Sequence, residues 1–127
     1  MPGNVQVTSF EPFQLDDFLY FQLKGKAEIV LRLNQEPSRR WVEEFSNLWS
    51  ALLKGLKDRG HHEFLSEVKI EWSGKRLHVS LPIAHYNLCV QEITGNIEAT
   101  NDLLARLGRE AEKEWELMLT FFGKLHQ

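Results

Sequence analysis

Residues 86–122, YNLCVQEITGNIEATNDLLARLGREAEKEWELMLTFF, decide the fold of this chain. Apolar side chains recur here at steps of three and four, which is the spacing of one face of an α-helix. Gly95 and Gly108 are poor helix formers, each costing about 1 kcal/mol relative to alanine, but the apolar phase continues unchanged through both. The spacing therefore predicts one long helix, continuous or gently kinked, over about residues 84–122. Its apolar face contains Tyr86, Val90, Ile93, Ile97, Leu104, Leu107, Ala111, Met118 and Phe121.

A helix of this length exceeds what the rest of the chain can cover. It would measure nearly 60 Å at about 1.5 Å per residue, whereas strands of five to eight residues span only about 17–27 Å. We expect a division near Leu103, beyond which large apolar side chains would stay exposed, and monomers rarely leave such a patch uncovered. We therefore expect a homodimer in which residues 104–127 project as a dimerisation helix. The predicted interface comprises Leu104, Leu107, Trp115, Met118, Leu119 and Phe122.

Two other arrangements of the terminal segment stay open. The chain could turn near Gly108 and fold back onto its own core. Alternatively, the helix could lie on a membrane surface, but four glutamates between residues 110 and 116 would then face anionic headgroups, and we expect no membrane contact.

Two predicted β-hairpins and a helix precede this segment. Alternating apolar residues predict strands over residues 19–23 and 27–33 around Lys24-Gly25-Lys26, with Leu23 facing Ala27. A second pair covers residues 68–72 and 77–81 around Ser73-Gly74, with Ile70 facing Leu77. Between the hairpins, an apolar stripe predicts a helix over about residues 37–59. Residues 5–13 are ambiguous and could form a short edge strand.

The fold class that follows is α+β, in a single domain over residues 1–127. We expect a two-layer sandwich in the order ββαββα, in which a four-stranded, mostly antiparallel sheet carries both helices on one face. The chain of 127 residues is 43% hydrophobic, enough for a core. Its net charge of −3 provides no overall field for nucleic acid, which we regard as an unlikely partner. A single cysteine and the absence of a signal-like N-terminus favour the cytoplasm, and we expect a bacterial source.

Few residues offer chemistry. His61-His62-Glu63 lacks the spacing of a zinc site, so we expect no metal. Cys89 and His85 form a nucleophile–base pair at i−4, but a packed, inert thiol is the favoured interpretation. No glycine-rich phosphate loop or nucleophile elbow occurs. We therefore expect no cofactor and no catalytic residues.

Arg39 and Arg40 begin the predicted first helix, where positive charge opposes the helix dipole. One interpretation is contact with an acidic partner. The other, which we favour, is i,i+4 pairing of Arg39 with Glu43 and of Arg40 with Glu44.

Excess apolar helix surface and sparse chemistry together favour a non-enzymatic protein–protein interaction or accessory module. An accessory subunit or an immunity-type partner of a larger bacterial protein fits this class. The alternative is a small-ligand-binding protein or small enzyme with a pocket between sheet and helices. Such a pocket could be lined by Tyr20, Trp72, His78 and His85.

Overall fold

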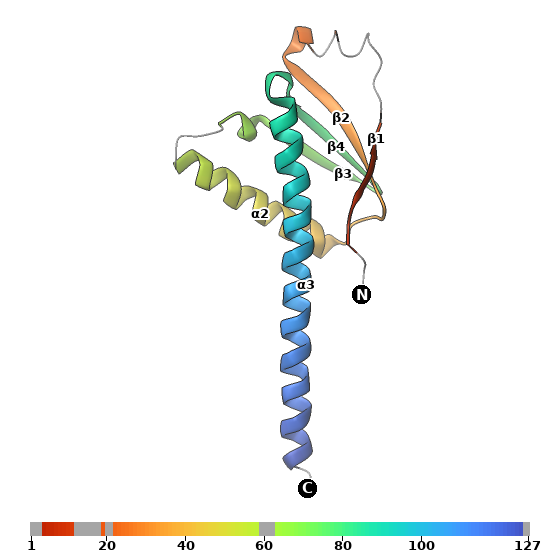
Figure 1. Ribbon diagram of the computed structural model, residues 1–127, viewed down its shortest axis with the longest axis vertical. Helices are drawn as coiled ribbons and strands as arrows, with labels where there is room; N and C mark the ends of the chain where they lie inside the picture. The colour runs from red at the N-terminus through yellow and green to blue at the C-terminus, as the bar shows by residue number, and fades with distance from the viewer. Residues whose placement is uncertain (1–3, 12–18, 20–21, 59–62, 126–127) are drawn as a thin grey trace.

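The computed structural model describes residues 4–11, 19, 22–58 and 63–125, and within them it has a four-stranded antiparallel sheet and a long C-terminal helix (Figure 1). The predicted α+β class is confirmed, and the strand order in the sheet is β1-β2-β4-β3. The elements are β1 (Val7–Phe10), β2 (Lys26–Leu33), α2 (Arg39–Asp58), the 3-10 helix η1 (Glu63–Glu67), β3 (Lys69–Ser73), β4 (Arg76–Pro82), the 3-10 helix η2 (Ile83–His85) and α3 (Tyr86–Leu125).

The predicted first hairpin is wrong. Leu19 and residues 22–24 are helical, Leu23 is 88% exposed, and the partner of β2 is β1. A strand has only two edges, and those of β2 are occupied by β1 and β4, so no edge is left for residues 19–23. Gly25 does adopt positive φ (72°), but it follows the helical residues instead of forming a hairpin loop. Tyr20 and Phe21 lie outside the described residues.

The second hairpin exists, but its predicted register is wrong by one place in the turn. Ile70 pairs with Val79 and Glu71 pairs with His78, so Leu77 faces Trp72 instead of Ile70. The loop is Gly74-Lys75, with Gly74 at φ 59°, instead of Ser73-Gly74. Both registers keep the apolar side chains on one face, because side-chain direction repeats every two residues. Alternation therefore could not distinguish the two registers, whereas the turn conformation does.

Helix α2 is attached to the sheet through aromatic side chains. Its first turn is capped by the Ser38 hydroxyl, which accepts a hydrogen bond from the Trp41 N–H at 3.1 Å. Trp41 stacks on Phe45 with ring centroids 5.6 Å apart, and Phe45 stacks on Trp49 at 6.2 Å. Trp72 of β3 meets Trp41 and Phe45 edge-on, at 5.5 and 5.1 Å. These offset and edge-to-face contacts add to the hydrophobic burial that holds α2 against β3.

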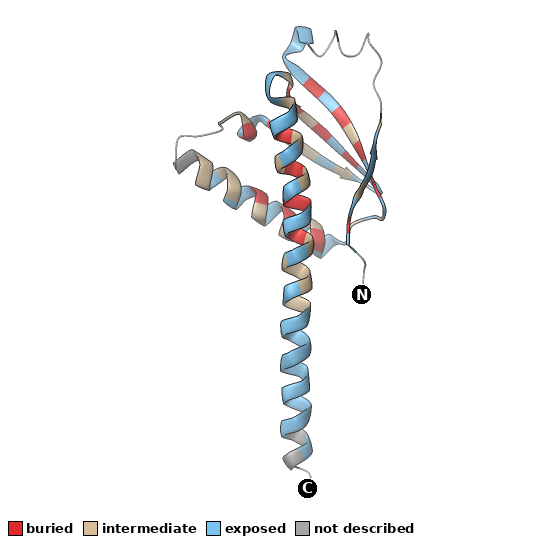
Figure 2. Ribbon diagram, in the orientation of Figure 1, coloured by how far each residue is buried: buried red, intermediate tan, exposed pale blue. Residues whose placement is uncertain are grey.

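The core is formed by one face of the sheet with side chains from α2 and α3 (Figure 2). Burial alternates along β2 and β4, so Ile29, Leu31, Leu77 and Val79 are buried while the residues between them are not. Helix α2 contributes its three aromatic residues, and α3 contributes residues that include Cys89, Ile93 and Ile97.

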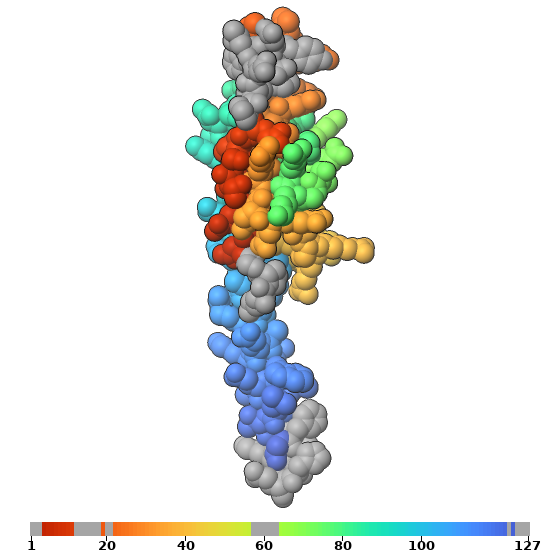
Figure 3. Space-filling view, turned by 90° about the vertical axis from the view of Figure 1, so that its right-hand side faces the viewer, coloured from red at the N-terminus to blue at the C-terminus, as the bar shows by residue number. Residues whose placement is uncertain are grey.

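The other face of the sheet is polar and is turned toward the viewer in Figure 3. Arg32 and Arg76 are register partners on β2 and β4, and such like charges would repel. The Glu11 carboxylate lies 3.2 Å from Arg32 Nε and 3.5 Å from Arg76 Nε, which offsets part of this repulsion.

Helix α3 runs unbroken for 40 residues, through both Gly95 and Gly108. The alternative in which the chain folds back near Gly108 is therefore wrong. Figure 1 shows the N-terminal half of α3 beside the sheet and its C-terminal half extending alone. We call residues 86–103 the proximal half and residues 104–125 the distal half.

The Asn101 carboxamide joins three parts of the chain where the proximal half ends. Its oxygen accepts hydrogen bonds from the Val5 N–H at 3.1 Å and the Trp41 indole N–H at 2.9 Å. Its amide nitrogen donates to the Val5 carbonyl at 2.8 Å. Asn34 holds the other side of this segment, because its amide donates to the Asn4 carbonyl at 2.9 Å and its side-chain oxygen accepts from the Gln6 N–H at 2.8 Å. The side chains of Asn34, just after β2, and of Asn101 on α3 thus hold residues 4–6 between them by hydrogen bonds.

Asn101→Ala should lower the free energy of unfolding by about 2–4 kcal/mol, because three hydrogen bonds are lost and partly buried donors and an acceptor lose their partner. Urea unfolding followed by tryptophan fluorescence measures the change. The control Asp102→Ala alters the exposed neighbouring residue and should stay within about 0.5 kcal/mol of the parent chain. Equal stabilities of the two variants would contradict the role assigned to Asn101.

Candidate functional site

The surroundings of α3 change along its length (Figure 2). Cys89, Ile93, Ile97 and Thr100 are at most 2% exposed, whereas every residue from 109 to 121 is exposed. Between these ranges, the side chains on the core side are half-buried, so the transition extends over about two turns instead of falling at a single point near Leu103.

The six predicted interface residues all lie on the distal half but in different surroundings. Trp115, Met118 and Leu119 are 59%, 48% and 53% exposed. Leu104 is half-buried and packs against the hydrophobic core, and Leu107 is also half-buried. Phe122 is helical, but its side chain lies outside the described part. The distal half is thus a projecting rod. Its first turn is half-buried, and the apolar residues farther along it are exposed.

Sequence reasoning missed Leu117, which is 71% exposed. Leu117 lies off the main apolar stripe, but it precedes Phe121 by four residues and so shares a flank of the helix with it. An explicit test for i,i+4 apolar pairs outside the stripe would have found it. Together with Phe121, which is 61% exposed, Leu117 widens the apolar surface near the end of α3.

A pocket of about 240 Å³ lies where the distal half leaves the body. Leu104 and Ala105 form its α3 side, and Pro37, Ser38 and Trp41 form the side at the start of α2. Asn4, Val5, Gln35, Glu36 and Asn101 complete its lining. The pocket therefore adjoins the root of the apolar face of the distal half.

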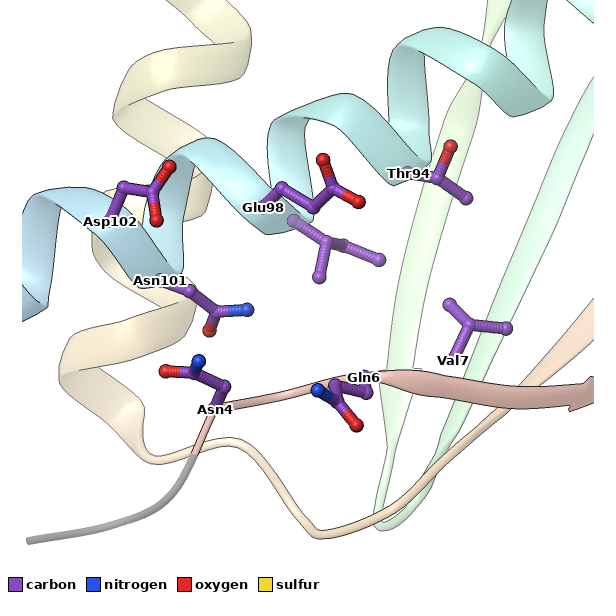
Figure 4. Close-up of a pocket in the computed structure, with 8 residues that line it drawn as sticks. Asn4, Gln6, Val7, Thr94, Glu98, Asn101 and Asp102 are labelled. Atoms are coloured by element: carbon purple, nitrogen blue, oxygen red, sulfur yellow. The ribbon is translucent and has the colours of Figure 1, made fainter.

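A second pocket, of about 510 Å³, lies between the N-terminal segment and α3 (Figure 4). Asn4, Gln6 and Val7 line one side and face Thr94, Glu98, Asn101 and Asp102 of α3 across it. Two carboxylates and three carboxamides give this site hydrogen-bonding capacity and negative charge. Both pockets are lined by Asn4 and Asn101, so they adjoin at these residues.

The residues suggested to line a pocket between sheet and helices are not brought together. Trp72 lines a space of about 220 Å³ with Trp49 and Val68, between α2 and the β3 edge. His78 is exposed and faces Glu71 and Val30, not Lys69 as the predicted register implied. His85 stacks on Phe64 with ring centroids 3.9 Å apart. Tyr20 lies outside the described residues.

Cys89 is fully buried and free. Burial raises the pKa of its thiol, and the nearby carboxylates Glu67 and Glu92 raise it further. A nucleophilic cysteine needs a lowered pKa, so this thiol suits packing.

Within residues 4–11, 19, 22–58 and 63–125, no group of histidine, cysteine, aspartate or glutamate side chains could hold a metal ion. His61 and His62 fall outside these residues.

Arg39 and Arg40 lie exposed on the first turn of α2. Arg39 Nε lies 3.3 Å from Glu43 Oε1, which is the expected i,i+4 pair. Among the described residues, a matching Arg40–Glu44 pair is not formed. The Arg39 side chain is 93% exposed, so this pair adds little to stability.

No protein family, curated protein or solved structure matches this chain. In the described part of the chain, no helix combines the length and the apolar character needed to span a membrane.

The buried Cys89 thiol should make the protein less stable at alkaline pH. Because the folded-state pKa is raised, its stabilising contribution is complete below the ordinary thiol pKa of about 8.5 and is lost as pH rises toward the folded-state value. The stability advantage of the parent chain over Cys89→Ala should therefore shrink as pH rises above about 8.5. Urea unfolding at a series of pH values measures this difference. A difference that grows with pH would contradict the pKa direction.

Proposed function

We propose that this protein is a non-enzymatic protein–protein interaction module that acts as a homodimer through the distal half of α3. The observation that carries the proposal is the exposure of Trp115, Leu117, Met118 and Leu119 on a helix that extends away from its own core. With Phe121, these side chains expose on the order of 600 Å² of apolar-rich surface, taking large side chains at about 200 Å² or more each. Patches of this size on soluble proteins are usually interaction sites.

Trp115, Met118 and Leu119 lie within about 100° of one another around α3, so one partner surface could cover all three, whereas Leu117 and Phe121 lie on another side of the helix. Trp115 is the strongest candidate anchor, because tryptophan dominates binding energy at interfaces. The polar outer face of the sheet and the inert Cys89 offer no competing chemistry.

We further propose that the fold is a two-layer sandwich with both helices on one face of the sheet. The single thiol suits a reducing compartment, so we place the module in the cytoplasm. An accessory or immunity-type role beside a larger bacterial protein requires only surface complementarity, which the rod and the Arg39–Arg40 turn could supply toward an acidic partner.

The parent chain should sediment as a dimer at high micromolar concentration. Trp115→Glu with Met118→Glu should convert it to a monomer, because both changes put charge into the apolar surface. Analytical ultracentrifugation or light scattering measures the mass, and circular dichroism checks that folding is retained. The control Lys113→Glu lies on the opposite side of α3 and should remain dimeric. A strictly monomeric parent chain would refute the homodimer.

A second candidate function, binding of a small polar ligand, is favoured by the 510 Å³ pocket between Gln6 and Glu98. Its volume falls within the range of small-molecule sites, although its lining is more polar than usual. The carboxylates of Glu98 and Asp102 would select a cationic ligand, such as a small amine.

A thermal-shift screen of metabolites, with polyamines included, tests this candidate. A ligand present at 100 times its dissociation constant stabilises the fold by about 2.7 kcal/mol, so the melting temperature should rise. Glu98→Gln with Asp102→Asn should abolish that rise. No ligand-dependent shift from any cationic compound would exclude this function at the screened concentrations.

A further inference from the structure

The apolar residues of the distal half are arranged symmetrically about Met118. They occupy matched positions one, three and seven residues before and after it: Leu117 and Leu119, Trp115 and Phe121, and Ala111 and Leu125. At about 100° per residue, Trp115 and Leu119 lie on one side of the Met118 direction, and Phe121 and Leu117 lie on the other. The apolar surface is therefore centred on Met118 both along α3 and around it.

We propose that a second copy of this chain docks antiparallel on this surface, with a two-fold axis passing at Met118. In a symmetric antiparallel pair, opposed residues have position numbers with a constant sum. Met118 then faces Met118 of the second copy, Trp115 lies level with Phe121, and Ala111 lies level with position 125. Methionine suits a layer in which it meets itself, because its flexible side chain adapts to the space. This inference rests on the proposed homodimer and specifies its geometry.

This register keeps the second copy clear of the body. Position 125 of the second copy, where α3 ends, lies level with Ala111, whereas the half-buried part of α3 ends at Gly108. The three residues between them span about 4.5 Å along the axis. Because the axis is two-fold, the same clearance separates the end of this copy from the body of the second one. The contact therefore lies within residues 111–125, in the part of α3 that extends alone in Figure 1.

The position of the body excludes a parallel pair. Thr100 precedes Met118 by eighteen residues, which is five full turns, so the two residues lie in the same direction from α3. Thr100 is fully buried, so the body lies on the side toward which the Met118 surface points. A parallel partner in register would continue along this side and pass through the body. An antiparallel partner instead runs past the end of the rod, away from it.

Charge complementarity also favours the antiparallel pair. Within the contact, Glu114 is the one charged residue placed within about 60° of Met118. A two-fold axis brings each flank of the helix against the same flank of its copy. Lys124 of the second copy then lies, by its position on α3, on the flank of Glu110 and Glu114 and midway between them. A parallel pair would instead set Glu114 beside Glu112 of the second copy, where like charges repel.

One partner helix in this register covers both sides of the apolar surface. On one flank, Leu119 lies about 3 Å along the axis from Trp115 of the second copy, and on the other flank Leu117 lies equally close to Phe121. Leu117 and Phe121 therefore meet the same helix as Trp115 and Leu119. The overlap is only about 22 Å long, so the contact is small and the dimer should dissociate on dilution.

Disulfide mapping in the full chain tests the register, in a Cys89→Ala background that removes the native thiol. Met118→Cys should form a disulfide-linked dimer under mild oxidation, because this position faces itself across the axis. Ala111→Cys is the matched control, since it lies on the same surface but about 21 Å along the axis from its own copy, beyond the reach of a disulfide. Self-linking of both variants would indicate a parallel pair, and self-linking of Ala111→Cys alone another register. Either result would overturn the inference.

Charge reversal tests the flank. Lys124→Glu should weaken the dimer at least threefold, because it adds a like charge beside Glu110 and Glu114 in both halves of the contact. Adding Glu114→Lys should restore most of the lost affinity. The control Lys113→Glu, on the side of α3 away from the contact, should change the dissociation constant less than twofold.

Sedimentation equilibrium measures these dissociation constants. Equal effects of the two lysine variants would overturn the register. A dimer by sedimentation without the Met118 cross-link would overturn the register alone, whereas a monomeric parent chain would overturn the proposed function as well.

Discussion

The contacts of one carboxamide, that of Asn101, determine how the rest of this structure is arranged. An amide side chain has the same donor and acceptor pair as a peptide group, so Asn101 can pair with both backbone groups of Val5. Its oxygen also accepts from Trp41, which begins the aromatic row joining α2 to β3. The N-terminal segment, α2 and α3 thus meet at one residue. Because α3 leaves the body there, the same contacts fix the direction of the projecting rod.

The buried stripe of α3 combines hydrophobic packing with a few polar groups that specify position. Asn96 donates to the Phe45 carbonyl of α2 at 3.1 Å, and the Thr100 hydroxyl donates to the Asn96 carbonyl at 2.7 Å. A buried Asn96 amide without a partner would be costly, so its hydrogen bond to Phe45 disfavours any other rotation or shift of α3 against α2. Apolar side chains alone would tolerate such shifts more readily. Thr100 interrupts the apolar stripe in the sequence, but its hydroxyl is satisfied within α3 by the carbonyl four residues earlier.

Periodicity predicted the elements whose burial is one-sided and long, and it failed where several pairings satisfied the same pattern. Helices α2 and α3 and the strands β2, β3 and β4 lie close to where the apolar spacing placed them. Residues 19–23 alternate like a strand, but β1, predicted only as an ambiguous edge segment, occupies the edge of β2. Competition for a strand edge is a property of the whole sheet, which no local pattern contains. The register of the β3–β4 hairpin failed for a related reason, because two turns one residue apart both keep the apolar faces together.

The candidate surface was predictable as a helix face but not residue by residue. The sequence indicated that the second half of α3 exceeds the reach of the sheet, and the structure shows residues 109–121 exposed. It did not reveal that Leu104 belongs partly to the core, because that depends on where the first turn of α2 and Val5 lie. The pocket beside Leu104 and the cluster at Asn101 arise from segments about 60 and 96 residues apart in sequence. Contacts at such separation carry no local signal.

Helix α3 continues without a break from the body into the distal half. Starting a helix in water is unfavourable, and an isolated segment of about 20 residues is only marginally helical. The distal half needs no nucleation of its own, since the proximal half is already held by the core and by Asn101. A partner docking on the distal half, as proposed above, would meet an apolar face that is already helical and oriented, so less conformational entropy would be lost. Gly108 weakens the helix by about 1 kcal/mol relative to alanine, and it lies where burial ends. A helix that depended on its own propensity alone would fray from this point, whereas the contacts of Asn101 hold α3 just before it.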